Sequence, residues 1–132
     1  MISRVFHPDM RADCDETATA LATAAFVCMR CNRLKRAKDL FLEAIEIYNR
    51  IGQSQSLVLA DVHSNFGELR EREKKYNKAK EQHDLAYRMR LKLVGDDHPL
   101  VADSLEELGH LRVFSNKLDK AEQLFLQAVG IR

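Results

Sequence analysis

Three alanines, Ala37, Ala79 and Ala121, recur in this chain with a constant 42-residue period, and each opens a similar stretch of sequence. A repeat of that length is the mark of one supersecondary unit that buries its apolar face against the next copy. The period therefore predicts a stacked array of units rather than one globular core. Arrays of this kind usually bind other molecules and rarely catalyse reactions.

The composition favours helices over strands. The 132 residues include only 5 Gly and 2 Pro, too few for the many turns of a β-sandwich. Ala, Leu, Glu, Lys and Arg, which are good helix formers, dominate instead. With 45% hydrophobic and 31% charged residues, the chain has the balance of a protein that faces water. We predict an all-α fold.

The last unit reads as a helical hairpin. Pro99 tolerates the first turn of a helix because its missing N–H would be unpaired there, and the preceding Asp96 and Asp97 can accept from the free N–H groups. A helix should therefore begin near residue 98 and end where Ser115 and Asn116 interrupt the pattern. Its apolar residues share one face: Val101, Leu105, Leu108 and Leu111. The second amphipathic helix carries Leu118, Ala121, Leu124, Phe125, Ala128 and Val129.

The same hairpin recurs upstream, clearly in the middle of the chain and more faintly before it. Gly67 and Ala79 match Gly109 and Ala121, and small residues are needed where helices cross closely, because a larger side chain would push the axes apart. The equivalent turn positions hold Asn32, Lys74 and Asn116. Asparagine is the non-glycine residue that best tolerates a left-handed backbone, so lysine is the less comfortable choice.

Leu108, Gly109, Ala121 and Ala128 resemble the pattern of the tetratricopeptide repeat. The 42-residue spacing and the segment from Arg90 to Leu105 more narrowly resemble the long repeats of kinesin light chains and nephrocystin-like proteins. The resemblance covers about residues 12 to 132 and implies three repeats, about 12–53, 54–97 and 98–132, which form a right-handed α-solenoid of three helical hairpins after an N-terminal arm, residues 1–11. It also implies a scaffold or adaptor that binds proteins and uses no cofactor.

In the family that the chain resembles, the first helix of each hairpin lines a concave groove that holds a peptide or a partner helix. Helical spacing then identifies the side chains that face inward. The expected groove residues are Phe26, Arg30, Asp61, Asn65, Glu68, Arg72, Asp103, Glu106, Glu107, His110 and Phe114. Two of the three stripes are mainly acidic, so we expect a partner with a lysine- or arginine-rich segment. A merely solvated acidic face is the alternative.

Charge and hydropathy argue against nucleic acids and membranes as partners. The 21 basic and 20 acidic residues nearly cancel, which gives no reason to expect nucleic-acid or membrane binding. Basic clusters occur near residues 30–38 and 74–80, but no aromatic residues are interleaved for base stacking. The longest uncharged run, residues 17–29, is too short to span a bilayer. We expect a cytoplasmic protein.

Cysteines and histidines give weaker signals. Cys28 and Cys31 have the spacing of half a zinc or redox site, but no second pair is visible, so we expect Cys28 to pack as a small apolar residue and no metal to bind. Cys14 and His7 would complete a site only if the N-terminal segment folded back. The sequence also lacks phosphate-binding loops, serine-hydrolase elbows and zinc-protease motifs, which argues against an enzyme.

His63 and His83 occupy places in the middle unit where the pattern usually has large apolar residues. We expect them to face each other across the hairpin as a hydrogen-bonded or partly hydrated pair, with a bridging metal as the less favoured alternative. If both are buried and neutral, protonation near about pH 5 to 6 should destabilise the fold.

A second hypothesis concerns the end of the array. The sequence stops on the last helix, so we expect Leu124, Phe125 and Val129 to be partly uncovered. Such an end predicts either self-association, for example a homodimer through the terminal repeat, or a place within a longer array.

Overall fold

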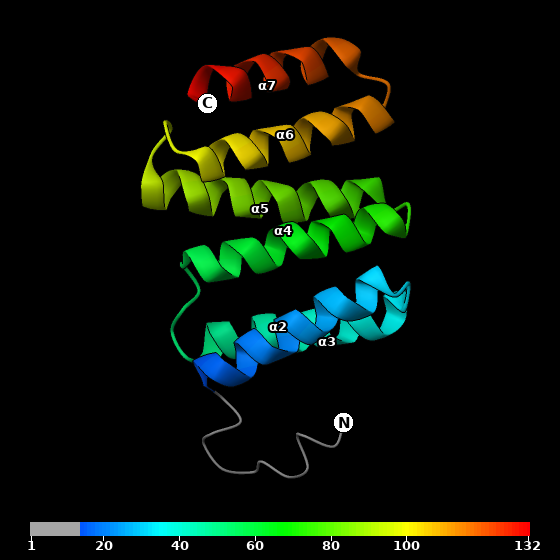
Figure 1. Ribbon diagram of the computed structural model, residues 1–132, viewed down its shortest axis with the longest axis vertical. Coiled ribbons are helices and arrows are strands. Elements are labelled where there is room, and N and C mark those ends of the chain that lie inside the picture. The colour runs from blue at the N-terminus through cyan, green and yellow to red at the C-terminus, as the bar shows by residue number, and fades with distance from the viewer. Residues whose placement is uncertain (1–13) are drawn as a thin grey trace. The chain divides into compact units, whose positions relative to one another are not determined.

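The computed structural model describes residues 14–132, and this part of the chain contains six α-helices and no strand (Figure 1). The helices are α2 (Asp15–Arg30), α3 (Leu34–Arg50), α4 (Leu57–Arg72), α5 (Tyr76–Val94), α6 (Pro99–Phe114) and α7 (Leu118–Ile131). The predicted all-α class is confirmed. The expected arm, residues 1–11, lies outside the described residues.

The helices pair as three hairpins with nearly identical turns. The backbone φ angles of Asn32, Lys74 and Asn116 are 65°, 64° and 59°, so all three turn residues are left-handed. In each turn the next N–H bonds back to a carbonyl near the end of the first helix: Arg33 to Cys28, Lys75 to Arg70 and Lys117 to Arg112. The 42-residue period of the sequence is thus a period of the backbone, and Lys74 adopts the conformation that its place in the repeat dictates.

The start of α6 differs from the expectation in its cap. The prediction that Asp96 or Asp97 accepts from the free N–H groups at the start of this helix is wrong. Instead His98 is the N-cap residue, and its Nδ1 accepts a hydrogen bond from the backbone N–H of Leu100 at 3.1 Å. Pro99 follows at the first helical position, as expected.

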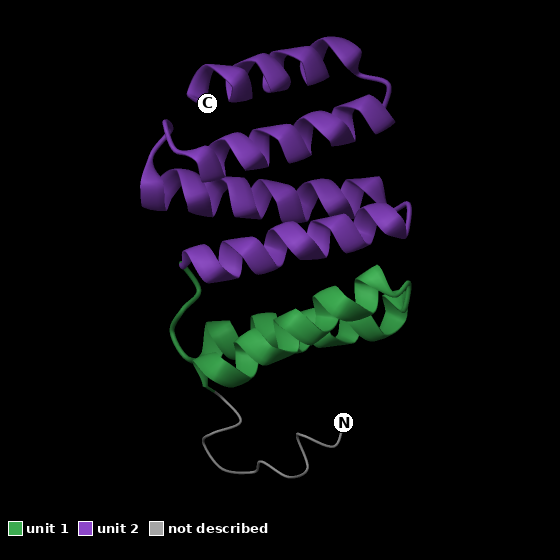
Figure 2. Cartoon of the chain, in the orientation of Figure 1, with its two compact units in different colours: residues 1–55 green, residues 56–132 purple. Residues whose placement is uncertain are grey.

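The chain divides into two compact units, residues 1–55 and 56–132 (Figure 2). In the first unit α2 packs on α3 around buried residues that include Ala25, Phe41 and Ala44. In the second, α4 packs on α5, α5 on α6 and α6 on α7. Each helical pair falls inside one of the three ranges predicted for the repeats.

Two glycines allow close helix crossings in the second unit. A Cβ atom on Gly67 would lie 2.7 Å from the ring of His83 on α5. A Cβ atom on Gly109 would lie 2.9 Å from the Phe125 ring on α7. Both glycines are needed for space rather than for backbone freedom, which confirms their predicted role in close packing.

We expect Gly67→Ala to lower the free energy of unfolding by about 1–3 kcal/mol through overpacking against His83, although alanine is normally the better helix former by about 1 kcal/mol. Gly130→Ala is the matched control because nothing lies within 4 Å of a Cβ at that helical position. The control should leave stability unchanged or raise it slightly. Urea titration measures both, and equal stabilisation by the two variants would contradict the crowding at Gly67.

Candidate functional site

A polar pair bridges the two helices of each hairpin at the same position of the repeat. The pairs are Thr19 with Tyr48, Asp61 with Arg90, and Asp103 with Arg132. The two members of each pair are 29 residues apart, and each pair recurs one repeat period after the pair before it. Asp61 and Asp103, two acids of the predicted groove, are therefore already bound by arginines from the second helices.

Arg90 joins three helices of the second unit. Its side chain lies on α5 and is only 4% exposed. Nη2 donates to Asp61 Oδ1 on α4 at 2.8 Å, and Nη1 donates to Ser104 Oγ on α6 at 2.8 Å. The planar guanidinium serves both directions at once, which the point charge of a lysine would not. The buried Arg90 side chain therefore links α4 and α6 through its hydrogen bonds.

Glu107 is held by three residues of the preceding hairpin. Ser64 on α4 donates to its Oε2, and its Oε1 lies 3.2 Å from His83 Nδ1 and 3.9 Å from Arg90 Nη1. Burial by itself would raise the pKa of the Glu107 carboxyl, but His83, Ser64 and Arg90 together lower that pKa below its ordinary value. Glu107 is thus an ionised internal partner rather than a free groove acid.

His83 is buried between two carboxylates, and the predicted pairing with His63 is wrong. Its ring is 2% exposed, with Nε2 2.7 Å from Glu71 Oε2 and Nδ1 near Glu107. Burial lowers the pKa of His83, yet the two carboxylates outweigh burial and raise that pKa to about 9. His63 Nδ1 instead lies 2.7 Å from Gln82 Oε1, and burial lowers the pKa of His63.

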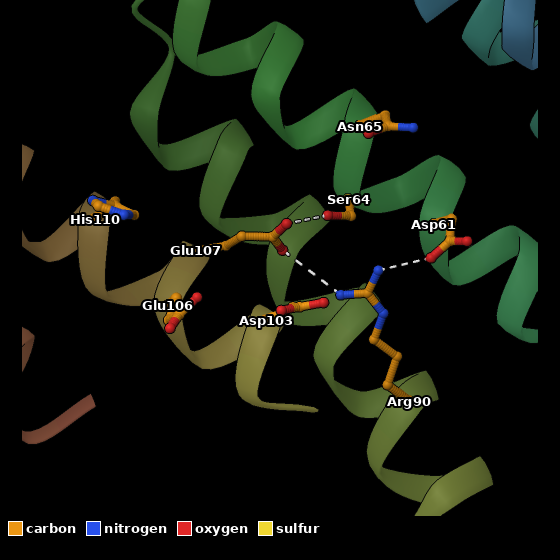
Figure 3. A pocket seen from close by; sticks show the side chains of 8 residues that line it. All are labelled: Asp61, Ser64, Asn65, Arg90, Asp103, Glu106, Glu107 and His110. Atoms are coloured by element: carbon orange, nitrogen blue, oxygen red, sulfur yellow. Dashed lines mark hydrogen bonds and ion pairs between the residues drawn. The ribbon is translucent and has the colours of Figure 1, made fainter. Parts of the chain in front are cut away.

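A pocket of about 440 Å³ opens among α4, α5 and α6 (Figure 3). It is lined by Asp61, Ser64, Asn65, Arg90, Asp103, Glu106, Glu107 and His110. Six of these residues were predicted for the groove. Ser64 and Arg90 were missed, although the constant offset that relates Asp61 to Arg90 and Asp103 to Arg132 was visible in the sequence.

The pocket has four carboxylates and one lining cation, Arg90. At its rim, Arg132 donates to Asp103 through Nη2 and to both oxygens of Glu106, at 3.1 Å from Nη2 and 3.3 Å from Nε. These contacts raise the pKa of the exposed Arg132 above its ordinary value. Asp103 and Glu106, one helical turn apart on α6, are therefore spaced to hold one guanidinium group.

Five predicted groove residues lie outside this pocket. Glu68 and Arg72 form an ion pair along α4 with 3.1 Å between Glu68 Oε2 and Arg72 Nη2. Phe114 stacks on Tyr76 with ring centroids 5.2 Å apart. Phe26 and Arg30 belong to the other unit, where the Arg30 guanidinium lies 5.7 Å from the Phe26 ring centroid. The pocket therefore contains only part of the predicted α4 and α6 stripes and none of the α2 stripe.

The cysteines are free thiols. Cys14 and Cys28 are half-buried and Cys31 is exposed. Within residues 14–132, no three His, Cys, Asp or Glu side chains are grouped so that they would hold a metal ion. His7 lies outside the described residues. Among the described helices, none combines the length and the apolar character needed to cross a membrane.

The chain is similar in structure to several solved helical-repeat proteins. The crystal structure of BtubC (BKLC) from P. vanneervenii matches with a TM-score of 0.85 and 22% identity, over 89% of this chain and 46% of that one. A putative kinesin light chain from Podosopora anserina, with nearly identical TPR-like repeats, matches with a TM-score of 0.76 and 15% identity, and a variant of it matches with 0.78 and 16%. Both of those matches cover 92% of this chain, and they cover 58% and 57% of the other chains.

The chain thus spans about half the length of these relatives, and the likeness confirms the predicted α-solenoid fold. No curated protein matches the sequence. The sequence model of the tetratricopeptide repeat matches residues 16–92 and 58–132, which together include every described helix except the first residue of α2. The chain belongs to the tetratricopeptide repeat family.

Proposed function

We propose that this chain is a non-enzymatic protein-interaction module that binds an arginine- or lysine-bearing segment of a partner in the pocket of its second unit. The tetratricopeptide fold generally serves as a scaffold for protein–protein interaction. The proposal concerns the ligand class, and it rests on the chemistry of Asp103 and Glu106.

The observation that carries the proposal is the position of Arg132. This arginine forms hydrogen bonds to both α6 carboxylates, a spacing that suits a guanidinium group. Both carboxylates and Arg132 are exposed enough for a competing cation to reach them. Bidentate and charge-assisted bonds of this kind are the stronger hydrogen bonds of proteins. An arginine of a partner would replace Arg132 on the same carboxylates.

The other acids of the pocket have different roles. Glu107 is occupied by Ser64, His83 and Arg90, so it orders the pocket floor rather than meeting a ligand. Asp61 is exposed and bonds Arg90 through Oδ1. We therefore assign ligand contact to Asp103 and Glu106, and long-range attraction of a basic segment to the whole acidic group.

We expect the double reversal Asp103→Lys with Glu106→Lys to weaken binding of a fluorescein-labelled arginine-rich peptide several-fold at low salt, and less at high salt. Fluorescence anisotropy measures the affinity. Glu81→Lys with Glu122→Lys, which changes net charge equally at exposed sites outside the pocket, is the control. Circular dichroism should show that both variants fold.

Arg132→Gln tests the same two carboxylates by removing the arginine that occupies them. Because it frees both carboxylates, it should strengthen binding of the arginine-rich peptide while leaving a glutamate-rich peptide unbound. Equal loss of affinity in the pocket and control reversals would reduce the interaction to net charge and overturn the assignment.

A further inference from the structure

An exposed aromatic residue continues the pocket along α6. Phe114 is 56% exposed, and it follows the pocket residue His110 by one helical turn on the same face of the helix. Asp103 and Glu107 lie further back on this face, toward the start of α6 (Figure 3). The face therefore changes along the helix from carboxylates in the pocket to an aromatic ring at the end of α6.

The exposure of Phe114 does not depend on its place in the last hairpin. Its equivalent one repeat period earlier is Arg72 on α4, and the hairpin of α6 and α7 follows that position in the chain. The Arg72 side chain is nevertheless 36% exposed, and it pairs with Glu68 of its own helix. This position of the repeat therefore stays open to solvent where another hairpin follows. Phe114 places an apolar ring where the earlier repeat has a charged side chain.

The ring of Phe114 is held from one side. It stacks on the ring of Tyr76, the first residue of α5, with centroids 5.2 Å apart and an angle of 22° between the ring planes. Tyr76 is half-buried and supports one face of the Phe114 ring, so the exposed area of Phe114 belongs to the rest of that ring. A ring fixed in this way loses little conformational freedom when a ligand packs on it.

We infer that the partner segment carries an apolar side chain, aromatic or aliphatic, that packs on Phe114 while its arginine occupies the carboxylates of Asp103 and Glu106. The inference rests on the proposed function and adds a second contact to it. The occupant is the same segment because both contacts lie along one helix, next to the same pocket. Phe114 is then a specificity-determining residue that separates basic segments with a correctly placed apolar residue from those without one.

The geometry of α6 sets the spacing of the two partner residues. At about 1.5 Å per helical residue, a guanidinium group between the carboxylates of Asp103 and Glu106 lies roughly 14 Å along the helix from Phe114. An extended chain covers about 3.3 Å per residue, so this distance corresponds to about four residues. Residues four apart in an extended chain also point to the same side. The expected ligand therefore has its apolar residue four positions before or after its arginine.

Chemical-shift titration of the isotope-labelled full chain with synthetic peptides tests the inference. The probes are glycine–serine peptides with one arginine and one phenylalanine four positions before or after it, and the reference peptide has serine in place of the phenylalanine. One of the two orders should bind about fivefold more tightly than the reference, as expected for an added aromatic pair. Peptides with the phenylalanine three positions away, which directs the ring to the opposite side, should bind like the reference.

Variants of Phe114 assign the contact to this ring. Phe114→Ala should remove the difference between the phenylalanine and reference peptides without changing the affinity of the reference, whereas Phe114→Leu should keep most of the difference. Val113→Ala is the matched control, because Val113 is 44% exposed but lies about 100° away around the helix. Each comparison is made between two peptides on the same folded variant, so a change in stability does not imitate the result.

The outcomes separate this inference from the proposed function. Equal affinities of the phenylalanine and reference peptides, with shifts at Asp103 and Glu106, would overturn the inference and leave the arginine site intact. A preference for the phenylalanine peptide that survives in Phe114→Ala would also overturn it, since the apolar contact would then lie elsewhere. Absence of shifts at Asp103 and Glu106 with every arginine peptide would overturn the proposed function and this inference together.

Discussion

Arg90→Ala is expected to lower the free energy of unfolding by about 3–5 kcal/mol, the typical cost of breaking a buried charged network by removing one partner. The variant leaves Ser104 without its donor and Glu107 with one cation fewer. It also removes the bond to Asp61 that ties α4 to α5. Urea unfolding followed by circular dichroism gives the value.

The matched control is Arg132→Ala, at the equivalent position of the last repeat. That arginine bonds Asp103 just as Arg90 bonds Asp61, but it is exposed, and exposed ion pairs contribute little to stability. We therefore expect little change from the control. Similar losses from the two variants would show that burial does not determine the importance of this repeat position. Arg90→Met, which keeps the apolar stem, separates lost packing from lost charge.

The fold was predictable because its determinants are local and periodic. The left-handed turn at Lys74 follows from its register with Asn32 and Asn116, even though lysine alone does not favour that conformation. The close crossing at Gly67 likewise follows from its register with Gly109. Equivalent positions recur in every repeat, so a weak sequence signal in one repeat is supported by a strong signal at the equivalent position of another.

The candidate site was predictable in position but not in charge. Helical spacing placed Asp103 in the inward stripe of its helix with Glu106 close by, and both line the pocket. Their neutralisation by Arg132 depends on a residue that lies on another helix, almost a whole hairpin later in the chain. Counting acids along one helix leaves out such partners, and so it overstated how acidic the groove is.

His83 shows the same limit most clearly. From the sequence it was a histidine at an apolar position, for which a neutral ring is the ordinary expectation. Its protonation depends on Glu71, on the first helix of its own hairpin, and on Glu107, on the first helix of the next hairpin. Only the fold brings these two carboxylates to opposite nitrogens of one buried ring.

The stability of the chain is therefore expected to fall as the pH rises from about 6.5 to 9. The folded-state pKa of His83, about 9, lies above the value of 6.5 for an unperturbed histidine. The stabilisation is fully present below pH 6.5, where both states bind the proton, and is lost as the folded state deprotonates. At about 1.4 kcal/mol for each pKa unit, the loss is on the order of 3 kcal/mol at most. Urea midpoints at intervals across this range measure it.

Through His63 the stability depends on pH in the opposite direction, and this contributes to the fall in stability at low pH. Burial lowers its pKa, so below pH 6.5 the unfolded state takes up a proton that the folded state does not, and stability falls as the pH falls. The lowered pKa of Glu107 adds a further loss on acidification below its ordinary value of 4.5. The combined profile should have its maximum near pH 6.5.

Two glutamine variants separate these contributions. His83→Gln should be less stable than wild type at pH 6.5 and should lack the decline between pH 6.5 and 9, because Glu71 and Glu107 no longer face a titrating cation. His63→Gln should keep that decline and lose part of the fall below pH 6.5. A decline above pH 6.5 that survives in His83→Gln would show that another group titrates there, and it would remove the evidence for a charged histidine between α4, α5 and α6.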